Sequence, residues 1–337
     1  MRSLKYIAQR LVSVVPVVIG VIIITFIIGY VVPADPVHLF IGQDDDPAMI
    51  ERVREQLGLN QPLYVQFYRY MVDFVRGDWG MSWSTRNPVM VDLQRRLPAT
   101  AELILLSLLV TVVLSFPLGV LSATRRDSLI DHVSRLVSLI GVAIPNFWLG
   151  LLLIYFLFAT VQIFPPPMGR IAMGMEVERM TGFMLVDTVL ARDGRAFWSA
   201  VTFLVLPVFT LAFSNLAQLM RLVRASMIES LASDYTTTAR AQGLPAWLIN
   251  SRLALRNSLL APVTQIGLIA GHLIGGAVIV EIVFAWPGIG NWAIDGALAG
   301  DFGPVRAVAI LAAFTRVVIF LLIDVTYTII DPRISYQ

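Results

Sequence analysis

Residues 229–257, ESLASDYTTTARAQGLPAWLINSRLALRN, form a polar stretch between two strongly apolar runs. Ser233 and Asp234 are predicted to open a helix, because a serine oxygen can accept bonds from the first free N–H groups and an acid suits the helix dipole. Gly243 is predicted to end this helix, since glycine adopts the left-handed backbone of a helix C-cap at little cost. Pro245 is predicted to begin a second helix, where its missing N–H is not needed. The stretch therefore indicates a short helix, a fixed corner and another helix.

The first of these helices carries small residues close to the chain reversal. Ala239 and Ala241 would allow the surface of another protein to approach the backbone. Tyr235 and Ala239 share a face because they are four residues apart, whereas Arg240 projects elsewhere. We interpret the helix as a docking element for another protein. The simpler interpretation, a basic loop that obeys membrane topology rules, explains the composition equally well.

The composition excludes an ordinary soluble domain. Of the 337 residues, 57% are hydrophobic and only 14% are charged. Several apolar runs reach the roughly 20 residues that a helix needs to cross a bilayer, so we predict an all-α polytopic membrane protein. The first run, residues 11–32, is too long for a signal-peptide core and lacks a small-residue cleavage site, so it is expected to be retained. The net charge of +2 gives no reason to expect nucleic acid as a partner.

Lys5 is the sole lysine of the sequence. A phosphate-binding loop of the form GxxxxGK[ST] needs a lysine that reaches the nucleotide phosphates, so the sequence contains no such loop. If ATP drives this protein, hydrolysis must take place on another polypeptide. With 0 cysteines and 3 scattered histidines, the sequence also offers no thiol nucleophile and no plausible metal site. No catalytic, cofactor-binding or metal-binding residue is predicted in this chain.

Positive charges at the ends of the apolar runs set the predicted topology. Arg2, Lys5 and Arg10 precede the first run, and Arg125 and Arg126 close the second. Because positive residues in short segments mark the cytoplasmic side, we place the N-terminus in the cytoplasm. Six predicted spans return the C-terminus to the same side; they cover residues 11–32, 99–124, 131–164, 197–222, 261–284 and 305–330.

The spans divide the chain into predicted parts. These are an N-terminal tail with the first span (1–32), an extracytoplasmic segment (33–98), a membrane core (99–330) and a cytoplasmic C-terminus (331–337). The core includes an irregular external loop (165–198) and the polar segment 229–257. A second external loop, WPGIGNW at 286–292, is rich in glycine.

Two amphipathic helices are predicted in the extracytoplasmic segment. Apolar residues recur at helical spacing in Pro47–Leu57 and in Pro62–Arg76, and a glycine follows each run. We interpret their apolar faces as the packing surface of a small helical subdomain outside the membrane. The alternative is that these faces dock a soluble partner.

Proline and ionisable residues mark candidate positions at membrane depth. Pro145 is predicted to kink the third span, because proline removes a backbone hydrogen bond. Charged residues within spans are costly and are therefore functional candidates. Glu102 and Glu281 lie near span ends, where a headgroup-level position also explains them. Arg316 and Asp324 are eight residues apart on one face, and they either line an aqueous path or pair with a neighbouring helix. Candidates for a translocation pathway are Pro145, Glu281, Arg316 and Asp324.

Close helix packing is predicted in the fifth span. This span carries small residues at helical spacing, which allow helices to approach one another closely. They are Gly267, Gly271, Gly275 and Gly276.

Nine short motifs, each occurring once, are spread along nearly the whole chain. They are ADPV (34–37), LGLNQP (57–62), GDWGMS (77–82), PNFWLG (145–150), TGFMLVDT (181–188), DYTTTARAQGLP (234–245), ALRNSLLAPV (254–263), EIVFAWPGIG (281–290) and DPRI (331–334). Together they resemble the inner-membrane permease subunits of bacterial dipeptide and oligopeptide ABC importers. The TGFMLVDT motif resembles the dipeptide branch in particular.

This resemblance implies the transmembrane fold of a type I ABC importer, in which the chain forms half of the pore. The implied partners are a second related permease, two cytoplasmic ATPase subunits that bind ATP and Mg, an extracytoplasmic substrate-binding protein and the lipid of the bacterial inner membrane. The ATPase subunits would act on a cytoplasmic coupling helix, and no cofactor would bind this chain. The implied coupling residues are Tyr235, Ala239, Arg240, Ala241, Gly243 and Leu244.

The sequence departs from the general importer motif at two places. That motif begins with Glu-Ala-Ala, whereas Thr237, Thr238 and Ala239 stand here, and a later Leu-Pro pair is replaced by Leu255 and Arg256. These departures concern the contact between the coupling helix and the surface of the ATPase subunit that receives it. The substrate stays open, since haem, glutathione, nickel complexes and some antibiotics pass through the same architecture.

The alternative function is that of a secondary transporter driven by ions. Glu281, Arg316 or Asp324 would then be the coupling group. The sequence shows no inverted internal repeat of the kind that many secondary carriers have.

Overall fold

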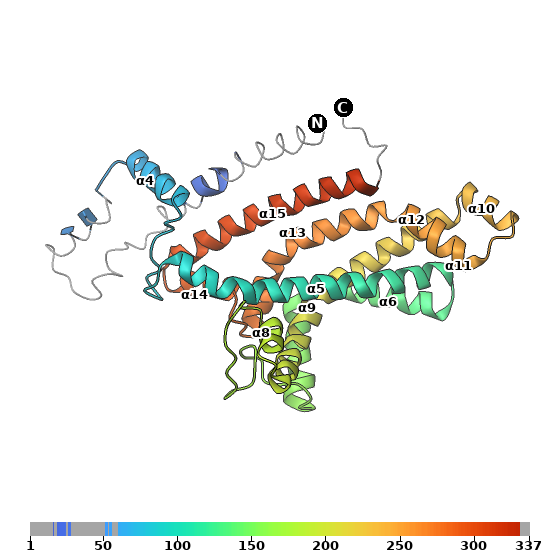
Figure 1. Ribbon diagram of the computed structural model, residues 1–337, viewed down its shortest axis with the longest axis horizontal. Helices are drawn as coiled ribbons and strands as arrows, with labels where there is room; N and C mark the ends of the chain where they lie inside the picture. The colour runs from blue at the N-terminus through green and yellow to red at the C-terminus, as the bar shows by residue number, and fades with distance from the viewer. Residues whose placement is uncertain are drawn as a thin grey trace. The chain divides into compact units, whose positions relative to one another are not determined.

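The structure is a computed structural model that describes residues 16, 19–24, 26–27, 51–52, 54–55 and 60–330, with the backbone alone from 324 to 330. Helices are the regular secondary structure of the described residues, which otherwise contain turns, irregular loops and one isolated bridge between Met81 and Pro88, and the predicted all-α class is confirmed. In chain order (Figure 1) the helices are α4 (Leu63–Val75), α5 (Val89–Thr124), α6 (Leu129–Ala143), α7 (Asn146–Leu153), the π-helix η1 (Ile154–Thr160), α8 (Met184–Leu190), α9 (Gly194–Leu231), α10 (Asp234–Ala241), α11 (Ala246–Leu248), the π-helix η2 (Ile249–Ala254), α12 (Leu255–Ser258), α13 (Leu260–Val283), α14 (Ile289–Leu298) and α15 (Phe302–Ile330).

Several of these helices can cross a membrane. Among the described residues, four are long and apolar enough: α5, α9, α13 and α15 as far as Ile323. A fifth crossing results if α6 and the α7–η1 arm are counted together, although they are bent by 106°. The first predicted span (11–32), the predicted helix Pro47–Leu57 and the C-terminus (331–337) lie largely or wholly outside the described residues. The protein is thus a multi-pass membrane protein.

The helices form two compact units. One comprises the chain up to Leu97 together with Gly288–Thr315, and the other comprises Pro98–Pro287 together with the chain from Arg316 on.

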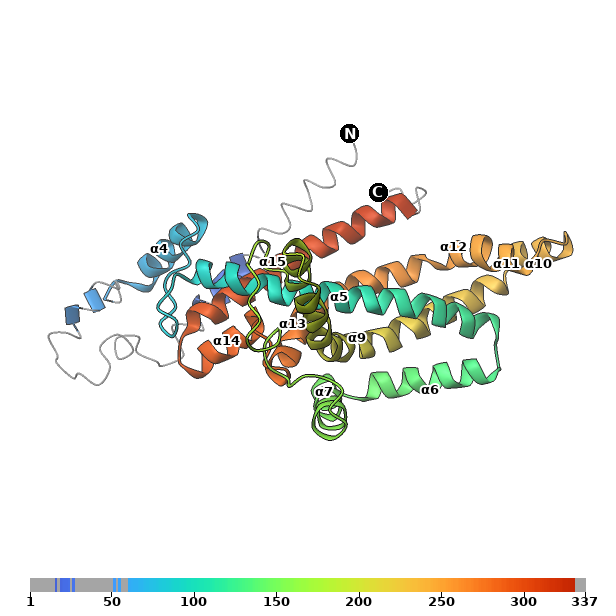
Figure 2. The ribbon, with the colours of Figure 1, turned by 60° about the horizontal axis from the view of Figure 1, so that its bottom comes forward.

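Helix α9 is the centre of the second unit. It packs against α6, α7, α8, α12 and α13, and Figure 2 shows α6 running alongside it. A Cβ added at Gly119 of α5 would lie 2.8 Å from Val223 of α9, and one added at Gly141 of α6 would lie 2.5 Å from the Cβ of Ala217. Because such contacts leave no room for a larger residue, these glycines allow α5 and α6 to approach α9 closely.

The predicted close packing of α13 is confirmed at one glycine. A Cβ at Gly267 would collide with Ile323 of α15, whereas a Cβ at Gly275 would meet nothing within 4 Å. The spacing of the glycines in the sequence therefore does not distinguish Gly267, which contacts another helix closely, from Gly275, which does not.

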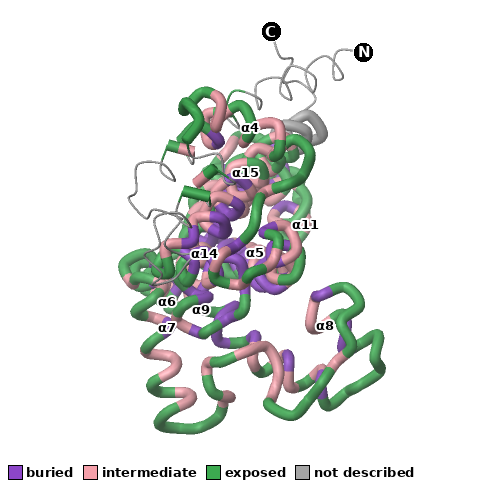
Figure 3. Tube along the Cα trace, turned by 90° about the vertical axis from the view of Figure 1, so that its left-hand side faces the viewer, coloured by how far each residue is buried: buried purple, intermediate pink, exposed green. Residues whose placement is uncertain are grey.

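The predicted break of the helix at Pro145 is confirmed, and the change in helix direction is greater than that of a kinked single helix. Pro145 is the N-cap of α7, with an extended backbone at ψ 141°, and the chain turns there by 106°. In Figure 3 the α7–η1 arm is intermediate or exposed along nearly its whole length, and Gly150 is its only buried residue.

The predicted Gly-rich loop WPGIGNW is confirmed at residues 286–288 and is wrong from Ile289 on. Helix α14 begins at Ile289, directly after the N-cap Gly288, and buries Ile289 and Trp292 in a core with Val89 and Leu93. This apolar face stabilises a helix that the glycines alone disfavour. The predicted helix Pro62–Arg76 is confirmed as α4, and Gly77 follows it with φ +84°.

Candidate functional site

The predicted corner of the segment 229–257 is confirmed. Helix α10 follows the N-cap Ser233, and Gly243 has the left-handed φ of +78°. The N–H of Gly243 donates to the carbonyl of Arg240 at 3.0 Å, and that of Leu244 donates to Ala239 at 3.1 Å. These bonds satisfy the last carbonyls of α10 and fix the direction in which the chain leaves it. Figure 1 shows α10 beyond the end of the α9 ribbon, where the chain reverses toward α11.

The predicted side-chain cap of α10 is wrong. The hydroxyl of Ser233 does not accept a bond from α10 but donates to the carbonyl of Ser230 at 2.6 Å. The reason is that α9 extends to Leu231, so its unpaired terminal carbonyls lie within reach of this hydroxyl.

The inner face of α10 is held by the chain itself. Thr236 is fully buried, and its hydroxyl donates to the carbonyl of Leu231 at 2.9 Å. Ser230 joins the neighbouring elements, since its hydroxyl bonds the Tyr235 hydroxyl at 2.5 Å and donates to the carbonyl of Ala254 at 2.9 Å. Ala239 is also buried. The side chain of Ala239 therefore packs within the chain, where a small residue fits, and its part in coupling stays a prediction.

The ring of Tyr235 is half exposed, while its hydroxyl faces inward. Burial raises the pKa of this hydroxyl, but hydrogen bonding with Ser230, Ser233 and Asn257 outweighs burial and lowers the pKa overall.

The outer surface of the corner is open and partly apolar. Arg240, Ala241, Gly243 and Leu244 are exposed, and Trp247 is 67% exposed. A cleft of about 330 Å³ lies beside them, lined by Thr124, Leu231, Arg240, Leu244, Ala246, Ile249 and Asn250. An exposed tryptophan next to a polar-rimmed cleft is typical of a protein-binding surface. The sequence analysis missed Trp247, although its aromatic side chain two residues after Pro245 was a usable signal.

A buried carboxylate joins three helices at the same end of α9. Asp131 of α6 is fully buried. Its carboxylate accepts hydrogen bonds from Nε and Nη2 of Arg224 in α9, at 2.6 and 2.9 Å. Ser122 of α5 donates to the same carboxylate at 2.6 Å, and the N–H of Asp127 donates at 3.1 Å. A bidentate arginine–carboxylate pair fixes both position and orientation. Arg224 could not be identified as the partner of Asp131 from the sequence, because the two residues lie 93 positions apart.

The candidate pathway residues lie on different helices. Glu281 of α13 is fully buried and accepts a hydrogen bond from Thr100 of α5 at 2.5 Å. Arg316 of α15 is exposed, and its Cγ lies 3.8 Å from the position that a Cβ on Gly271 would take. Within the described residues Arg316 forms no ion pair, whereas the side chain of Asp324 lies outside them.

Glu102 forms an ion pair with a residue distant in the sequence. Arg170, in the predicted external loop, donates to the Glu102 carboxylate, which also accepts the N–H of Leu185 at 2.8 Å. Arg170 lies over the ring of Trp286 at 5.7 Å, and the indole of Trp286 donates to the carbonyl of Ala99 at 2.9 Å. These contacts fasten the loop to α5.

The same loop has an ordered internal structure. Asp187 of α8 accepts the N–H and the hydroxyl of Thr181 at 2.7 and 2.6 Å, and the N–H of Gly182 at 2.9 Å. Burial raises the pKa of Asp187, but these hydrogen bonds outweigh burial and hold the pKa below its ordinary value. The TGFMLVDT motif is thus a closed turn in which Asp187 binds the start of the motif.

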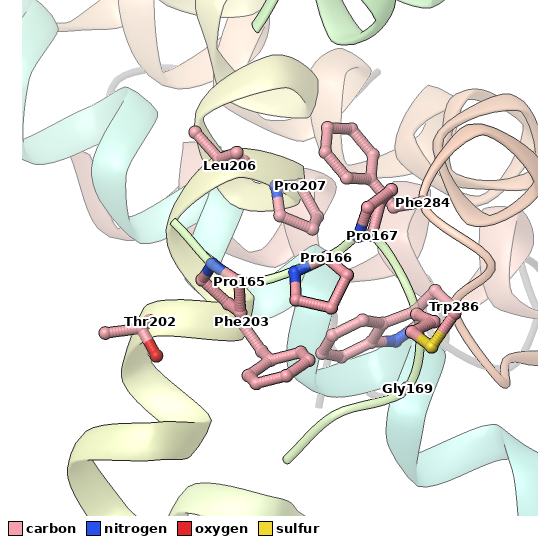
Figure 4. A pocket seen from close by; sticks show the side chains of 11 residues that line it. Pro165, Pro166, Pro167, Gly169, Thr202, Phe203, Leu206, Pro207, Phe284 and Trp286 are labelled. Atoms are coloured by element: carbon pink, nitrogen blue, oxygen red, sulfur yellow. The ribbon is translucent and has the colours of Figure 1, made fainter. Parts of the chain in front are cut away.

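The loop also covers an apolar pocket next to α9. Figure 4 shows Pro166 between Pro207 of α9 and the ring of Trp286, with Phe203 and Phe284 nearby. The enclosed space is about 10 Å³, which is room for roughly one water. The pocket is therefore a packing site and does not hold a substrate in this conformation.

The family of this chain follows from comparison with known proteins. The family described as the binding-protein-dependent transport system inner membrane component matches residues 115–336, and its N-terminal counterpart matches residues 3–104. The chain belongs to this family. It is a membrane permease subunit of an ABC transport system and is not itself an enzyme; its family works with ATPase and substrate-binding protein subunits.

Named relatives are similar over nearly the full length. The chain is 43% identical to the probable D,D-dipeptide transport system permease protein of Escherichia coli (strain K12), over 97% of this chain and 96% of that protein. It is 38% identical to the di/tripeptide transport system permease protein of Pseudomonas aeruginosa (strain UCBPP-PA14), over 99% of both. It is 37% identical to the oligopeptide transport system permease protein of Bacillus subtilis (strain 168), over 98% of this chain and 99% of that protein.

Proposed function

We propose that this permease forms half of an ATP-driven import path for short peptides, with dipeptides as the first candidates. The observation that carries the proposal is the corner at Gly243, whose outer surface from Arg240 to Trp247 is open to a partner. The printed names of its relatives, which are permeases for D,D-dipeptides, di- and tripeptides and oligopeptides, support the substrate class. The sole lysine, Lys5, fits a chain without its own nucleotide-binding loop.

The proposed complex contains a second permease, two ATPase subunits with ATP and Mg, and a substrate-binding protein. The permease lies in the bacterial inner membrane with both termini and α10 in the cytoplasm. The segments 33–98 and 165–198 then face the binding protein, and 99–330 is the membrane core. Orientation follows from Arg2, Lys5 and Arg10 ahead of the first apolar run.

Force enters through the exposed residues of the corner. The coupling surface comprises Tyr235, Arg240, Ala241, Gly243 and Leu244, and Trp247 extends it. Ala239 acts from the inside: together with Thr236 it seats α10 on its own chain, so a push on α10 is passed to α9 and η2. Because packed helices move as rigid elements, the push rotates them instead of being absorbed locally.

The Asp131–Arg224 pair carries this motion across the bundle. It ties the end of α9 to α6, and Ser122 ties it to α5. Pro145 supplies the sharp turn beyond α6. Among the proposed pathway residues, Arg316 is exposed on this subunit and suits a position facing the second permease, and Asp324 is proposed from its place eight residues further along the sequence. Glu281 accepts a hydrogen bond from Thr100 and so links α13 to α5. In this proposal it positions the helices that line the path.

Uptake by proteoliposomes tests the proposal. The vesicles contain both permeases and the ATPase subunits, with the binding protein and a labelled dipeptide outside. We expect uptake that requires ATP on the ATPase side and persists when a protonophore collapses the ion gradients. Uptake that stops with the protonophore and continues after ATP depletion would instead support the ion-coupled carrier with Glu281, Arg316 or Asp324 as coupling group.

The substrate class is tested with the binding protein. A ligand that binds the folded state of the binding protein raises the melting temperature of that protein by mass action. We expect L,L- or D,D-dipeptides to raise this temperature and haem to leave it unchanged; the reverse would remove peptides as the substrate.

A further inference from the structure

Helix α4 presents two different faces. On one face, Phe67 and Tyr70 contact Phe26 of the first apolar run, with ring centroids 5.3 and 5.8 Å apart. Phe74 on the same side stacks on Trp79 at 5.1 Å. This inner face is therefore partnered within the first unit of the chain.

These contacts set the depth of α4 relative to the membrane. Phe26 comes before residue 32, the predicted end of the first span, and therefore belongs to that span. A helix in contact with Phe26 is thus level with the outer part of the bilayer and does not stand clear of it.

A second contact agrees with this depth. Arg306, near the start of α15, places its guanidinium carbon 5.4 Å from the centre of the Tyr70 ring. Its Nε donates to the carbonyl of Phe302 at 3.3 Å, so the side chain points back toward the helix start. Arginines near the ends of membrane helices place their charge at the water interface. Tyr70, and with it α4, is held at that level.

The remaining apolar face of α4 has no partner among the described residues. Tyr64, Tyr68 and Val75 are 76%, 69% and 78% exposed. At 100° per residue they fall within about 40° of one another on the helix surface. Arg69 and Asp73 are exposed on the polar side of α4. Tyrosines beside an apolar strip, with charges opposite, are typical of a helix that lies in the membrane interface.

We propose that α4 is an interfacial helix that inserts Tyr64, Tyr68 and Val75 among the lipid headgroups and upper acyl chains. Phe26 and Arg306 hold it at the depth where the bilayer covers this strip.

Spin labelling tests the proposal in the assembled complex in lipid nanodiscs. Because the chain has 0 cysteines, Tyr68→Cys and Asp73→Cys each provide a single labelling site on this subunit. The two positions lie on one helix, so Asp73 is the matched control. We expect the label at 68 to be several-fold more accessible to oxygen than to a water-soluble nickel chelate, and the label at 73 to show the opposite preference.

Two results would overturn the proposal. One is equal access of the nickel chelate to both labels, which would place the strip in water. The other is a label at 68 that becomes protected only when the substrate-binding protein is added, which would make the strip a protein-docking surface. Either result leaves ATP-dependent uptake untouched, so failure of this inference is distinct from failure of the proposed function.

Discussion

Gly243→Pro is expected to abolish ATP-dependent uptake while the subunit still enters the membrane. Gly243 has φ +78°, whereas proline fixes φ near −65°. Proline would also remove the N–H that donates to Arg240. Both effects destabilise the corner where α10 turns into α11. The measurement is dipeptide uptake together with ATPase activity of the purified complex, in which we expect hydrolysis to be uncoupled from transport.

Gly243→Ala is the matched control. A Cβ at this position would meet nothing within 4 Å, so only the left-handed backbone penalty applies, about 1–2 kcal/mol. We expect uptake by Gly243→Ala to be lower than that of the unmodified complex and higher than that of Gly243→Pro. Uptake by Gly243→Pro at the rate of the unmodified complex would show that the corner transmits no force. Ala239→Trp does not serve the same purpose, since Ala239 is buried and the variant would disturb packing within the chain.

Arg224→Ala is expected to destabilise the membrane core strongly. Asp131 is fully buried, and removal of Arg224 takes away its bidentate partner and leaves Arg135, at 3.5 Å, as its ionic partner. Breaking one side of a buried pair costs about 3–5 kcal/mol. The measurement is the thermal unfolding midpoint of the purified complex, followed by tryptophan fluorescence. We expect a lower midpoint and a reduced yield of assembled complex.

Two further variants separate the pair from general charge effects. Arg221→Ala removes the same charge from an exposed position one turn away on α9, and we expect a change within about 0.5 kcal/mol. Asp131→Asn combined with Arg224→Gln is expected to be less harmful than Arg224→Ala alone, because no buried charge remains. An Arg224→Ala complex as stable as the Arg221→Ala complex would contradict the role assigned to the pair.

Features fixed by local backbone chemistry could be predicted from the sequence. The corner after α10 follows from the ability of Gly243 to adopt positive φ, and the turn after α6 follows from Pro145. The start of α4 after Pro62 and its end before Gly77 rest on the same kind of signal. In each case the determining residue and the structure that it determines are neighbours in the chain.

Features that depend on distant residues could not be predicted. The partner of Asp131 lies 93 positions away, and the ion pair of Glu102 with Arg170 spans 68 positions. The burial of Ala239 depends on how α10 lies against α9 and η2, which residue spacing does not reveal. The helical start of α14 at residues 289–292 contradicts the loop that its glycines indicate, because it depends on the core that covers Ile289 and Trp292.

The contact between α10 and an ATPase subunit is tested most directly by photo-cross-linking. An Ala241→Cys subunit carries one thiol in a chain with 0 native cysteines, and it is labelled with benzophenone maleimide before assembly with its partners. Glu178→Cys, exposed in the loop between η1 and α8, is the control. Force transfer through α10 predicts an adduct with an ATPase subunit from position 241 and none from position 178. The absence of an ATPase adduct at 241 in an assembled, transporting complex would contradict it.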